Sequence, residues 1–374
     1  MRYGYFIWVT RLHPDVCLNP LHPPLLREVT VLTLWENIAL FVVAGGAITW
    51  AGTQLAGLAD RLADRTGMGE ALAGTLFLGV VTSLAGLAVS LTAALEGRPA
   101  LAISNALGGI AVQTAFLALA DISYRKANLE HATASLRNIA QIALLVITLA
   151  LILLALAGPQ VSLGPVHPVT PMILLVLIVG AVIVYRIGEN PMWTPRNTKD
   201  TVTDDPEPKA QNERLAPLII KFTFVGTVVL LAGVAVAHTT GIIADKTGIS
   251  ESVAGAMISG VVTSLPELVT TLAAVRRGAL TLAVADIVGG NTFDMMFIVV
   301  VDIAYLSGSA FGAPTVGMRE IFLVGLIILL NVILLLGMLY RQTSGPGNIG
   351  LESVLVLVTY VGGFVVLASM GQGG

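Results

Sequence analysis

The sequence contains little charge and almost no cysteine. Asp, Glu, Lys and Arg together make up 11% of the 374 residues, whereas a soluble globular domain contains about 25%. Charge this sparse cannot cover a water-facing surface of this size, which excludes soluble enzymes, nucleic-acid-binding proteins and disordered chains. The single cysteine, Cys17, excludes an internal disulfide and any cysteine-based metal site.

Apolar residues are abundant and occur in long runs. They make up 55% of the chain, and the mean hydropathy is +0.86. A membrane-spanning helix needs about 20 mostly apolar residues, and no long alternating strand pattern appears. The sequence therefore predicts an all-α polytopic membrane protein with ten transmembrane helices, over residues 35–55, 69–95, 99–123, 134–157, 169–187, 216–238, 251–275, 279–305, 318–340 and 350–370.

Two segments lie outside these spans. Residues 1–34 form an N-terminal extension that is rich in proline. We expect it either to be disordered or to precede a true translation start near Val29. Residues 188–215 contain four prolines and most of the clustered charge, which predicts a solvated linker between five spans over 35–187 and five spans within 216–374.

The positions of the basic residues predict an orientation in the membrane. If the N-terminus is outside, the inside segments hold 14 Lys and Arg residues and the outside segments hold 6. Basic residues concentrate in cytoplasmic loops. We therefore expect a multi-pass protein of the cell (inner) membrane, with both termini outside and the linker in the cytoplasm.

The chain contains an internal repeat. Residues 63–124 align without a gap with residues 244–305 at a constant offset of 181, with 25 identities in 62 positions. The copies begin at the second and seventh spans, which are an odd number of spans apart, so they face opposite ways across the membrane. Such inverted repeats are typical of secondary transporters, in which the ion site lies near the midplane where the repeats meet.

The second copy carries two acids in the middle of its spans. Glu267 follows Pro266, which interrupts the helix hydrogen bonds, and Thr263 and Ser264 precede it. Asp294 lies in the middle of the next span. Ionisable groups inside spans are costly and usually functional, and carboxylate, hydroxyl and carbonyl oxygens are the ligands of hard cations. The two acids therefore predict one cation site.

The first copy supplies no carboxylate to this site. Thr82 and Ser83 match the two hydroxyl residues, Gln113 stands at the position of Asp294, and Ala85 and Gly86 replace the Pro-Glu pair. The aligned pair Asn105 and Asp286 is either a second layer around the ion or structural. Asp121 and Asp302 lie near span ends, where we expect solvation or a pair with Arg125.

The segment GVVTSLPELVTT (260–271), followed by DIVGGNTFD (286–294), closely resembles the second α-repeat of the sodium/calcium exchanger (cation/Ca²⁺ antiporter) superfamily. Residues 63–124 resemble the first α-repeat. The resemblance implies two inverted five-helix halves, a midplane site and alternating access by sliding of the first and sixth helices. It implies the following cation ligands: Glu267, Asp294, Thr263, Ser264, Thr82, Ser83 and Gln113, the last at the position of a usual asparagine.

The chain departs from the family pattern at the site. Members normally carry Pro-Glu in the first repeat as well, where this chain has Ala85 and Gly86. Gly109 and Gly290 replace a usual small hydroxyl residue in each repeat. The site has thus lost one carboxylate and two hydroxyls, and Ca²⁺ prefers 6–8 oxygens. We therefore expect weaker Ca²⁺ binding than in typical members.

These features favour a secondary cation antiporter that exchanges Ca²⁺ for Na⁺ or H⁺. The alternatives are a monovalent cation/H⁺ antiporter and a degenerate paralogue that no longer transports. An intramembrane enzyme has little support, because no His lies near a candidate serine, so we expect no enzymatic activity. The expected partners are inorganic cations and the lipid bilayer, with no nucleic acid, and no cofactor is expected besides the transported Ca²⁺, Na⁺ or H⁺.

Overall fold

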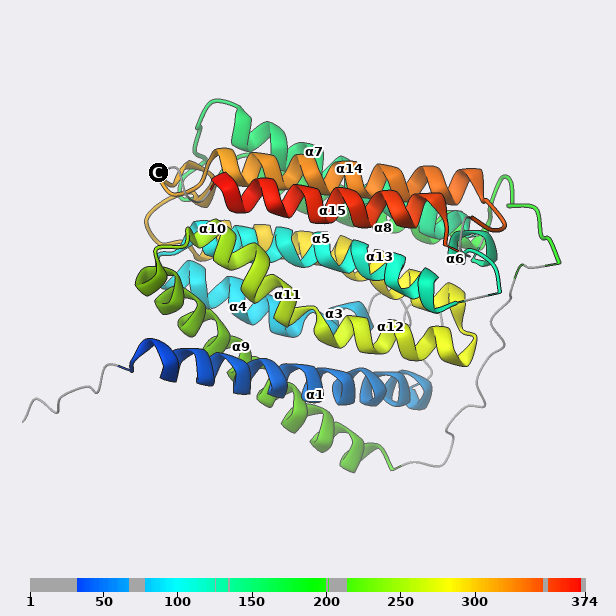
Figure 1. Ribbon diagram of the computed structural model, residues 1–374, viewed down its shortest axis with the longest axis horizontal. Coiled ribbons are helices and arrows are strands. Elements are labelled where there is room, and N and C mark those ends of the chain that lie inside the picture. Colours follow the sequence, from blue (N-terminus) through cyan, green and yellow to red (C-terminus); the bar gives the residue numbers. More distant parts are fainter. Residues whose placement is uncertain are drawn as a thin grey trace, which may run out of the picture.

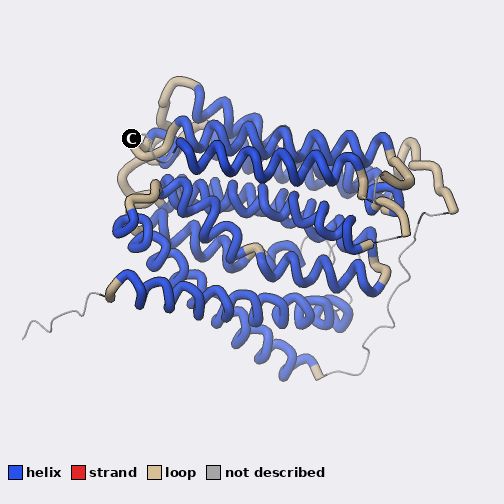
Figure 2. The backbone as a smooth tube through the Cα atoms, in the orientation of Figure 1, coloured by secondary structure: helices blue, strands red, loops and turns tan. Residues whose placement is uncertain are grey.

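The computed structural model describes most of the chain as helices and connecting loops. It covers residues 32–66, 78–124, 126–133, 135–199, 201, 214–345 and 349–370. Residues 1–31 of the expected N-terminal extension and residues 200 and 202–213 of the expected linker lie outside these ranges. Within the described part, Figure 2 shows helices and loops but no strand. The prediction of an all-α protein is confirmed.

The helices fall into two sets, one on each side of the linker. Before the linker they are α1 (Leu34–Thr66), α3 (Leu78–Thr82), α4 (Leu84–Leu95), α5 (Pro99–Ser123), α6 (Leu129–Ala132), α7 (Leu136–Ala157) and α8 (Val169–Glu189). After it they are α9 (Leu215–Thr247), α10 (Glu251–Val253), the π-helical turn η2 (Ala254–Ser259), α11 (Gly260–Thr263), α12 (Leu265–Arg277), α13 (Leu280–Ala304), the 3₁₀ turn η3 (Ala310–Gly312), α14 (Met318–Tyr340) and α15 (Leu351–Met370).

Helix length and composition agree with a polytopic membrane protein. Eight described helices are long and apolar enough to cross a membrane. A ninth candidate is a bent pair, Glu251–Thr263 and Leu265–Arg277, whose halves meet at 42°. Of the expected span 69–95, residues 78–95 contain α3 and α4, and residues 69–77 lie outside the described part.

The helices pack in three layers (Figure 1). Helices α1 and α9 form one outer layer and pack side by side. The other outer layer contains α7, α8, α14 and α15. The middle layer contains α3 to α5 and α10 to α13. Helix α5 is buried along its spanning length and α13 over 67% of it, so these two helices form the centre of the bundle.

The two halves run in opposite directions (Figure 1). Helices α3 and α4 run from the right of the view to the left, whereas α10 to α12 run from left to right. Helices α5 and α13 also run opposite to each other, and so do α1 and α9. The inverted arrangement predicted from the 181-residue offset is therefore present in the fold.

Both copies break their helix at the same aligned serine. Ser83 separates α3 from α4 with φ −75° and ψ −2°, and Ser264 separates α11 from α12 with φ −94° and ψ 1°. Pro266 stands in the first turn of α12, where its missing N–H removes no helix hydrogen bond. The first copy has Ala85 at the proline position and breaks all the same. Proline is therefore not required for the break.

Glycines let the two copies cross closely. A Cβ at Gly79 would lie 3.4 Å from Cα of Gly290, and a Cβ at Gly260 would lie 3.0 Å from the backbone nitrogen of Gly109. These two contacts are related by the repeat offset. The crossing of α5 with η2 is tighter still, because a Cβ at Gly108 would lie 2.4 Å from a backbone atom. Side chains at these positions would push the helices apart.

The expectation that Asp121 and Asp302 are solvated is wrong, because both are fully buried. Arg125, the other expected partner, lies outside the described residues. Asp121 accepts a hydrogen bond from the backbone N–H of Leu129 at 2.7 Å. Asp302 accepts from the backbone N–H groups of His167 and Ala310, each at 2.8 Å. Each acid therefore holds neighbouring backbone segments in place at the C-terminal end of its own helix, α5 for Asp121 and α13 for Asp302.

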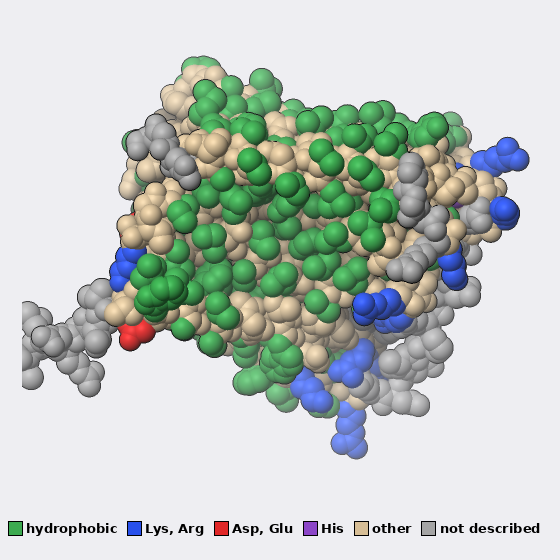
Figure 3. All heavy atoms as spheres, viewed as in Figure 1, with side chains coloured by type: hydrophobic (Ala, Val, Ile, Leu, Met, Phe, Trp, Pro, Cys, Tyr) green, Lys and Arg blue, Asp and Glu red, His purple; other side chains and the backbone are tan. Residues whose placement is uncertain are grey.

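The described part of the linker is partly held against the bundle rather than wholly solvated. Arg341, which follows α14, donates a hydrogen bond to the carbonyl oxygen of Arg196 at 2.7 Å. A ring nitrogen of His131 lies 2.8 Å from the hydroxyl of Thr198. Figure 3 shows that Lys and Arg side chains gather at the end of the bundle that carries the linker, on the right of the view.

We expect Gly108→Ala to destabilise the protein. Its Cβ would lie 2.4 Å from Cα of Ala256, so α5 and η2 would have to separate, and overpacking of this kind costs about 1–3 kcal/mol. The melting temperature in detergent should fall by several degrees. Gly325→Ala in α14 is the control, because its Cβ would meet no atom within 4 Å, and it should leave the melting temperature unchanged or higher. An unchanged melting temperature for Gly108→Ala would contradict the close crossing.

Candidate functional site

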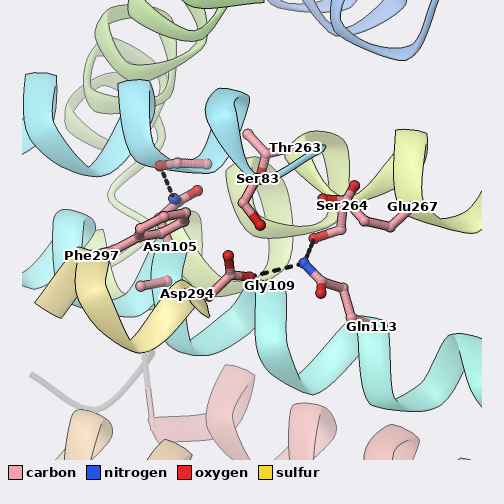
Figure 4. A pocket seen from close by; sticks show the side chains of 11 residues that line it. Ser83, Asn105, Gly109, Gln113, Thr263, Ser264, Glu267, Asp294 and Phe297 are labelled. Atoms are coloured by element: carbon pink, nitrogen blue, oxygen red, sulfur yellow. Dashed lines mark hydrogen bonds between the residues drawn. The ribbon is translucent and has the colours of Figure 1, made fainter. Parts of the chain in front are cut away.

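A small cavity lies where the helix breaks of the two copies meet the centres of α5 and α13 (Figure 4). Its volume is about 10 Å³, which is about the room that one water molecule or one dehydrated ion needs. No basic side chain is among the described residues that line it, which are Ser83, Gly86, Asn105, Ala106, Gly109, Gln113, Thr263, Ser264, Glu267, Asp294 and Phe297.

The structure brings six of the seven predicted site residues to this cavity. They are Ser83, Gln113, Thr263, Ser264, Glu267 and Asp294. The seventh, Thr82, is buried one residue earlier, and its hydroxyl donates to the carbonyl oxygen of Gly79 at 3.2 Å. Thr263 makes the equivalent bond to the carbonyl oxygen of Gly260, also at 3.2 Å. Both threonine hydroxyls therefore bond to the turn before the helix break.

Gln113 joins the two copies at the centre of the site. Its Nε2 donates to Oδ2 of Asp294 at 3.1 Å and lies 3.2 Å from Oγ of Ser264, to which it also donates (Figure 4). Gln113 and Asp294 are equivalent positions of the repeat, 181 residues apart. The axis that relates the two copies therefore passes between these two side chains.

Five side-chain oxygens of the lining residues have no hydrogen-bond partner. They are Oγ of Ser83, Oδ1 of Asn105, Oε1 of Gln113, Oε2 of Glu267 and Oδ1 of Asp294. Each side chain is at most 3% exposed. Leaving a buried acceptor unpaired costs about 1–3 kcal/mol, and more for a charged group. A cation bound between these oxygens would remove that cost.

The oxygens belong to two carboxylates and several neutral groups, not to a cage of acids. Within the described residues, no three Asp, Glu, His or Cys side chains converge as a resident metal site requires. Seven lining side chains carry oxygen, and only those of Glu267 and Asp294 carry charge. This set can coordinate a cation that enters and leaves.

Asn105 and its equivalent Asp286 differ in position. Asn105 lines the cavity, and its Nδ2 donates to the carbonyl oxygen of Gly86 at 3.1 Å and to Oγ of Ser90 at 2.9 Å. Asp286 lies outside the lining and accepts a hydrogen bond from Oγ1 of Thr270 at 3.2 Å. Asn105 thus braces the helix beside the cavity, whereas Asp286 bonds within its own half.

Phe297 is the lining residue that the sequence reasoning missed. A Cβ at Gly86 would lie 2.9 Å from ring atom Cε2 of Phe297, and the ring is buried and packs edge-to-face on Phe293 with centroids 6.1 Å apart. The ring therefore occupies the space where a glutamate at position 86 would begin. Its identity with Phe116 at the equivalent position of the first copy was the available signal.

Known proteins resemble the chain over nearly its whole length. The family model for the sodium/calcium exchanger protein matches residues 36–186 and 217–370. Inner membrane protein YrbG of Escherichia coli (strain K12) is 25% identical over 336 residues, which are 89% of this chain and 95% of that protein.

Solved structures share the fold. The H⁺/Ca²⁺ exchanger CAX superposes with a TM-score of 0.64 at 14% identity, over 89% of this chain and 85% of that chain. The sodium-calcium exchanger NCX_Mj superposes with a TM-score of 0.58 at 16% identity, over 89% and 99%. The family match covers both halves, including the helix breaks and the central cavity. The chain therefore belongs to the sodium/calcium exchanger protein family, whose members are polytopic cation antiporters.

Proposed function

We propose that this chain is a secondary antiporter that exchanges Ca²⁺ for Na⁺ or H⁺ through the cavity between Glu267 and Asp294. The observation that carries the proposal is the set of unpartnered oxygens that face this cavity from both copies. The family match and the names of the H⁺/Ca²⁺ exchanger CAX and the sodium-calcium exchanger NCX_Mj support the choice of cations.

The charge of the site favours a simple exchange. The site is neutral when its two carboxylates bind one divalent ion. It is also neutral when each carboxylate binds one proton. Exchange of one Ca²⁺ for two H⁺ at this site would therefore move no net charge. The ring of Phe297 beside Gly86 reduces the oxygens within reach, and this observation favours the second candidate, a monovalent cation/H⁺ antiporter.

Glycines on the outer layer support access by sliding. A Cβ at Gly52 of α1 would lie 2.6 Å from the ring of Pro266, and a Cβ at Gly233 of α9 would lie 3.0 Å from the carbonyl oxygen of Ala85. These pairs are equivalent in the repeat. Each outer helix therefore packs a glycine, which has no side chain, against the helix break of the opposite half. Such a surface suits α1 and α9 moving past the middle layer and opening the cavity to one side and then the other.

The proposed location is the inner membrane, with the linker in the cytoplasm and both termini outside. The relative YrbG is named an inner membrane protein, which supports a location in the inner membrane. The excess of Lys and Arg at the end of the bundle that carries the linker supports the orientation.

We expect Glu267→Gln to abolish Ca²⁺ uptake. The amide keeps the size of the side chain but removes one of the two charges that bind the cation, so Ca²⁺ would lose a charged ligand in a low-dielectric site. The measurement is Ca²⁺ uptake into proteoliposomes of purified protein, driven first by an outward Na⁺ gradient and then by an outward H⁺ gradient. The gradient that drives uptake identifies the coupling ion.

The matched control for this variant is Glu189→Gln at the exposed end of α8, which should transport at the wild-type rate. Wild-type flux that persists in Glu267→Gln would refute the assignment of the site. Absence of Ca²⁺ uptake in the wild type under both gradients, with Na⁺/H⁺ exchange present, would favour the second candidate. Absence of both would indicate a degenerate protein that does not transport.

We expect Gly86→Glu to require a second change at Phe297. The single variant should unfold at a lower temperature, because its Cβ would lie 2.9 Å from the ring. The double variant Gly86→Glu with Phe297→Ala has room for the side chain and adds a third carboxylate. It should bind Ca²⁺ at a lower half-saturating concentration than Phe297→Ala alone, measured by uptake or calorimetry. Equal concentrations for these two variants would show that position 86 does not face the ion.

A further inference from the structure

A second cavity, which shares no lining residue with the ion cavity, lies on the outer layer between α1 and α9. Its volume is about 380 Å³, within the usual range for small-molecule sites. Trp50, Gln54, Gly57 and Arg61 line it from α1. Their spacing of four, three and four residues places them along one helical stripe. Lys221, Phe224 and Val225 line it from α9. The cavity is therefore a groove along the seam of the outer layer.

The groove is basic at one end and aromatic at the other. Among the described residues that line it, two are basic and none is acidic. Arg61 lies near the end of α1 and Lys221 near the start of α9. The two helices run in opposite directions, so both cations lie at the linker end of the bundle (Figure 1). Trp50 and Phe224 are 61% and 66% exposed and lie deeper along the helices.

This order of groups matches the order of groups in a phospholipid. Basic pockets between transmembrane helices bind anionic lipid headgroups, and anionic lipids are attracted to basic residues at the membrane surface. The aromatic side chains are exposed and lie farther from the linker end than the two cations, on the side where the acyl chains of a lipid bound there would run. Gly57 has open space where its Cβ would be, so a chain can lie against the helix backbone there.

We infer that the groove between α1 and α9 binds an anionic phospholipid, with its phosphate at Arg61 and Lys221 and an acyl chain over Trp50 and Phe224. A zwitterionic lipid carries a compensating positive charge and binds more weakly at two cations. The groove shares no lining residue with the ion cavity. Lipid binding can therefore be measured without ion flux.

Trp50 reports on the groove directly. A variant that keeps Trp50 as its only tryptophan (Trp8, Trp35 and Trp193 changed to Phe) is reconstituted in phosphatidylcholine vesicles. Acyl-brominated phosphatidylglycerol or acyl-brominated phosphatidylcholine is then added at increasing mole fraction. Half-maximal quenching of Trp50 should need at least about threefold less of the brominated phosphatidylglycerol. A variant that keeps only Trp35, at the other end of α1, should be quenched equally by both lipids.

Two variants test the groove in different ways. Arg61→Gln with Lys221→Gln should remove the preference for phosphatidylglycerol at Trp50, whereas Arg186→Gln with Arg276→Gln, at the same end of the bundle, should keep it. Gly57→Leu fills the groove without changing its charge and should also remove the preference. Gly362→Leu in α15, where a Cβ likewise has open space, is its control.

Equal quenching of Trp50 by the two lipids would overturn the inference. A preference that survives both Arg61→Gln with Lys221→Gln and Gly57→Leu would overturn it as well. Free phosphate carries no brominated acyl chain and cannot quench Trp50, so a preference for the brominated phosphatidylglycerol distinguishes a bound lipid from free phosphate.

Discussion

The structure depends on holding two carboxyl groups beside broken helices in the middle of an apolar bundle. Glu267 and Asp294 are at most 2% exposed, and charges in such a place are tolerated only with compensating partners. The partners that the fold supplies are hydroxyls and one amide, and they leave an oxygen of each acid unpaired. The fold around the site therefore keeps a place for a mobile positive charge. A complete set of hydrogen bonds would have filled that place permanently.

The repeat explains how one chain builds such a site. Equivalent serines break both helices, and equivalent glycines at 79 and 260 let each break approach the central helix of the other copy. The two copies have nevertheless diverged where the charge lies. The second copy keeps both acids, whereas the first provides Gln113, whose amide donates to Asp294. An amide at this position ties the acid to the opposite half without neutralising it.

Phe297 shows how the loss of one glutamate is accommodated. A glycine at position 86 alone would leave a void beside the cavity, and voids in packed interiors are costly. The ring of Phe297 lies against this glycine, so the lost polar group has been replaced by apolar packing. Because the ring fills the space beside Gly86, little room remains there for a water molecule to provide the oxygen ligand that a glutamate would have supplied. The number of carboxylates is therefore fixed at two by shape as well as by sequence.

The sequence alone predicted the parts of the fold that follow from periodicity and repetition. Most of the spans and the inverted halves follow from apolar runs and one offset, and the meeting of Glu267 with Asp294 follows from their equal depth in neighbouring spans. The repeat marks Phe297 through its identity with Phe116, but the place of its ring beside Gly86 could not be predicted, because it depends on how the two halves pack. The burial of Asp121 was missed for a different reason. Its partners are the backbone N–H groups of Leu129 at the start of α6 and of Gly350, which is distant in sequence, and composition does not reveal either contact.

The groove proposed to bind lipid lies between α1 and α9, the two helices proposed to slide during transport. Arg61 and Lys221 lie on different outer helices, and a phosphate between them holds those helices in one relative position. A ligand shifts a conformational equilibrium only by its difference in affinity for the two states. A lipid that stays bound while α1 and α9 slide together would stabilise the protein and leave exchange unaffected. A lipid that binds only one position of the seam would favour that state and slow the exchange, so the effect of lipid on flux depends on whether the two helices move as one body.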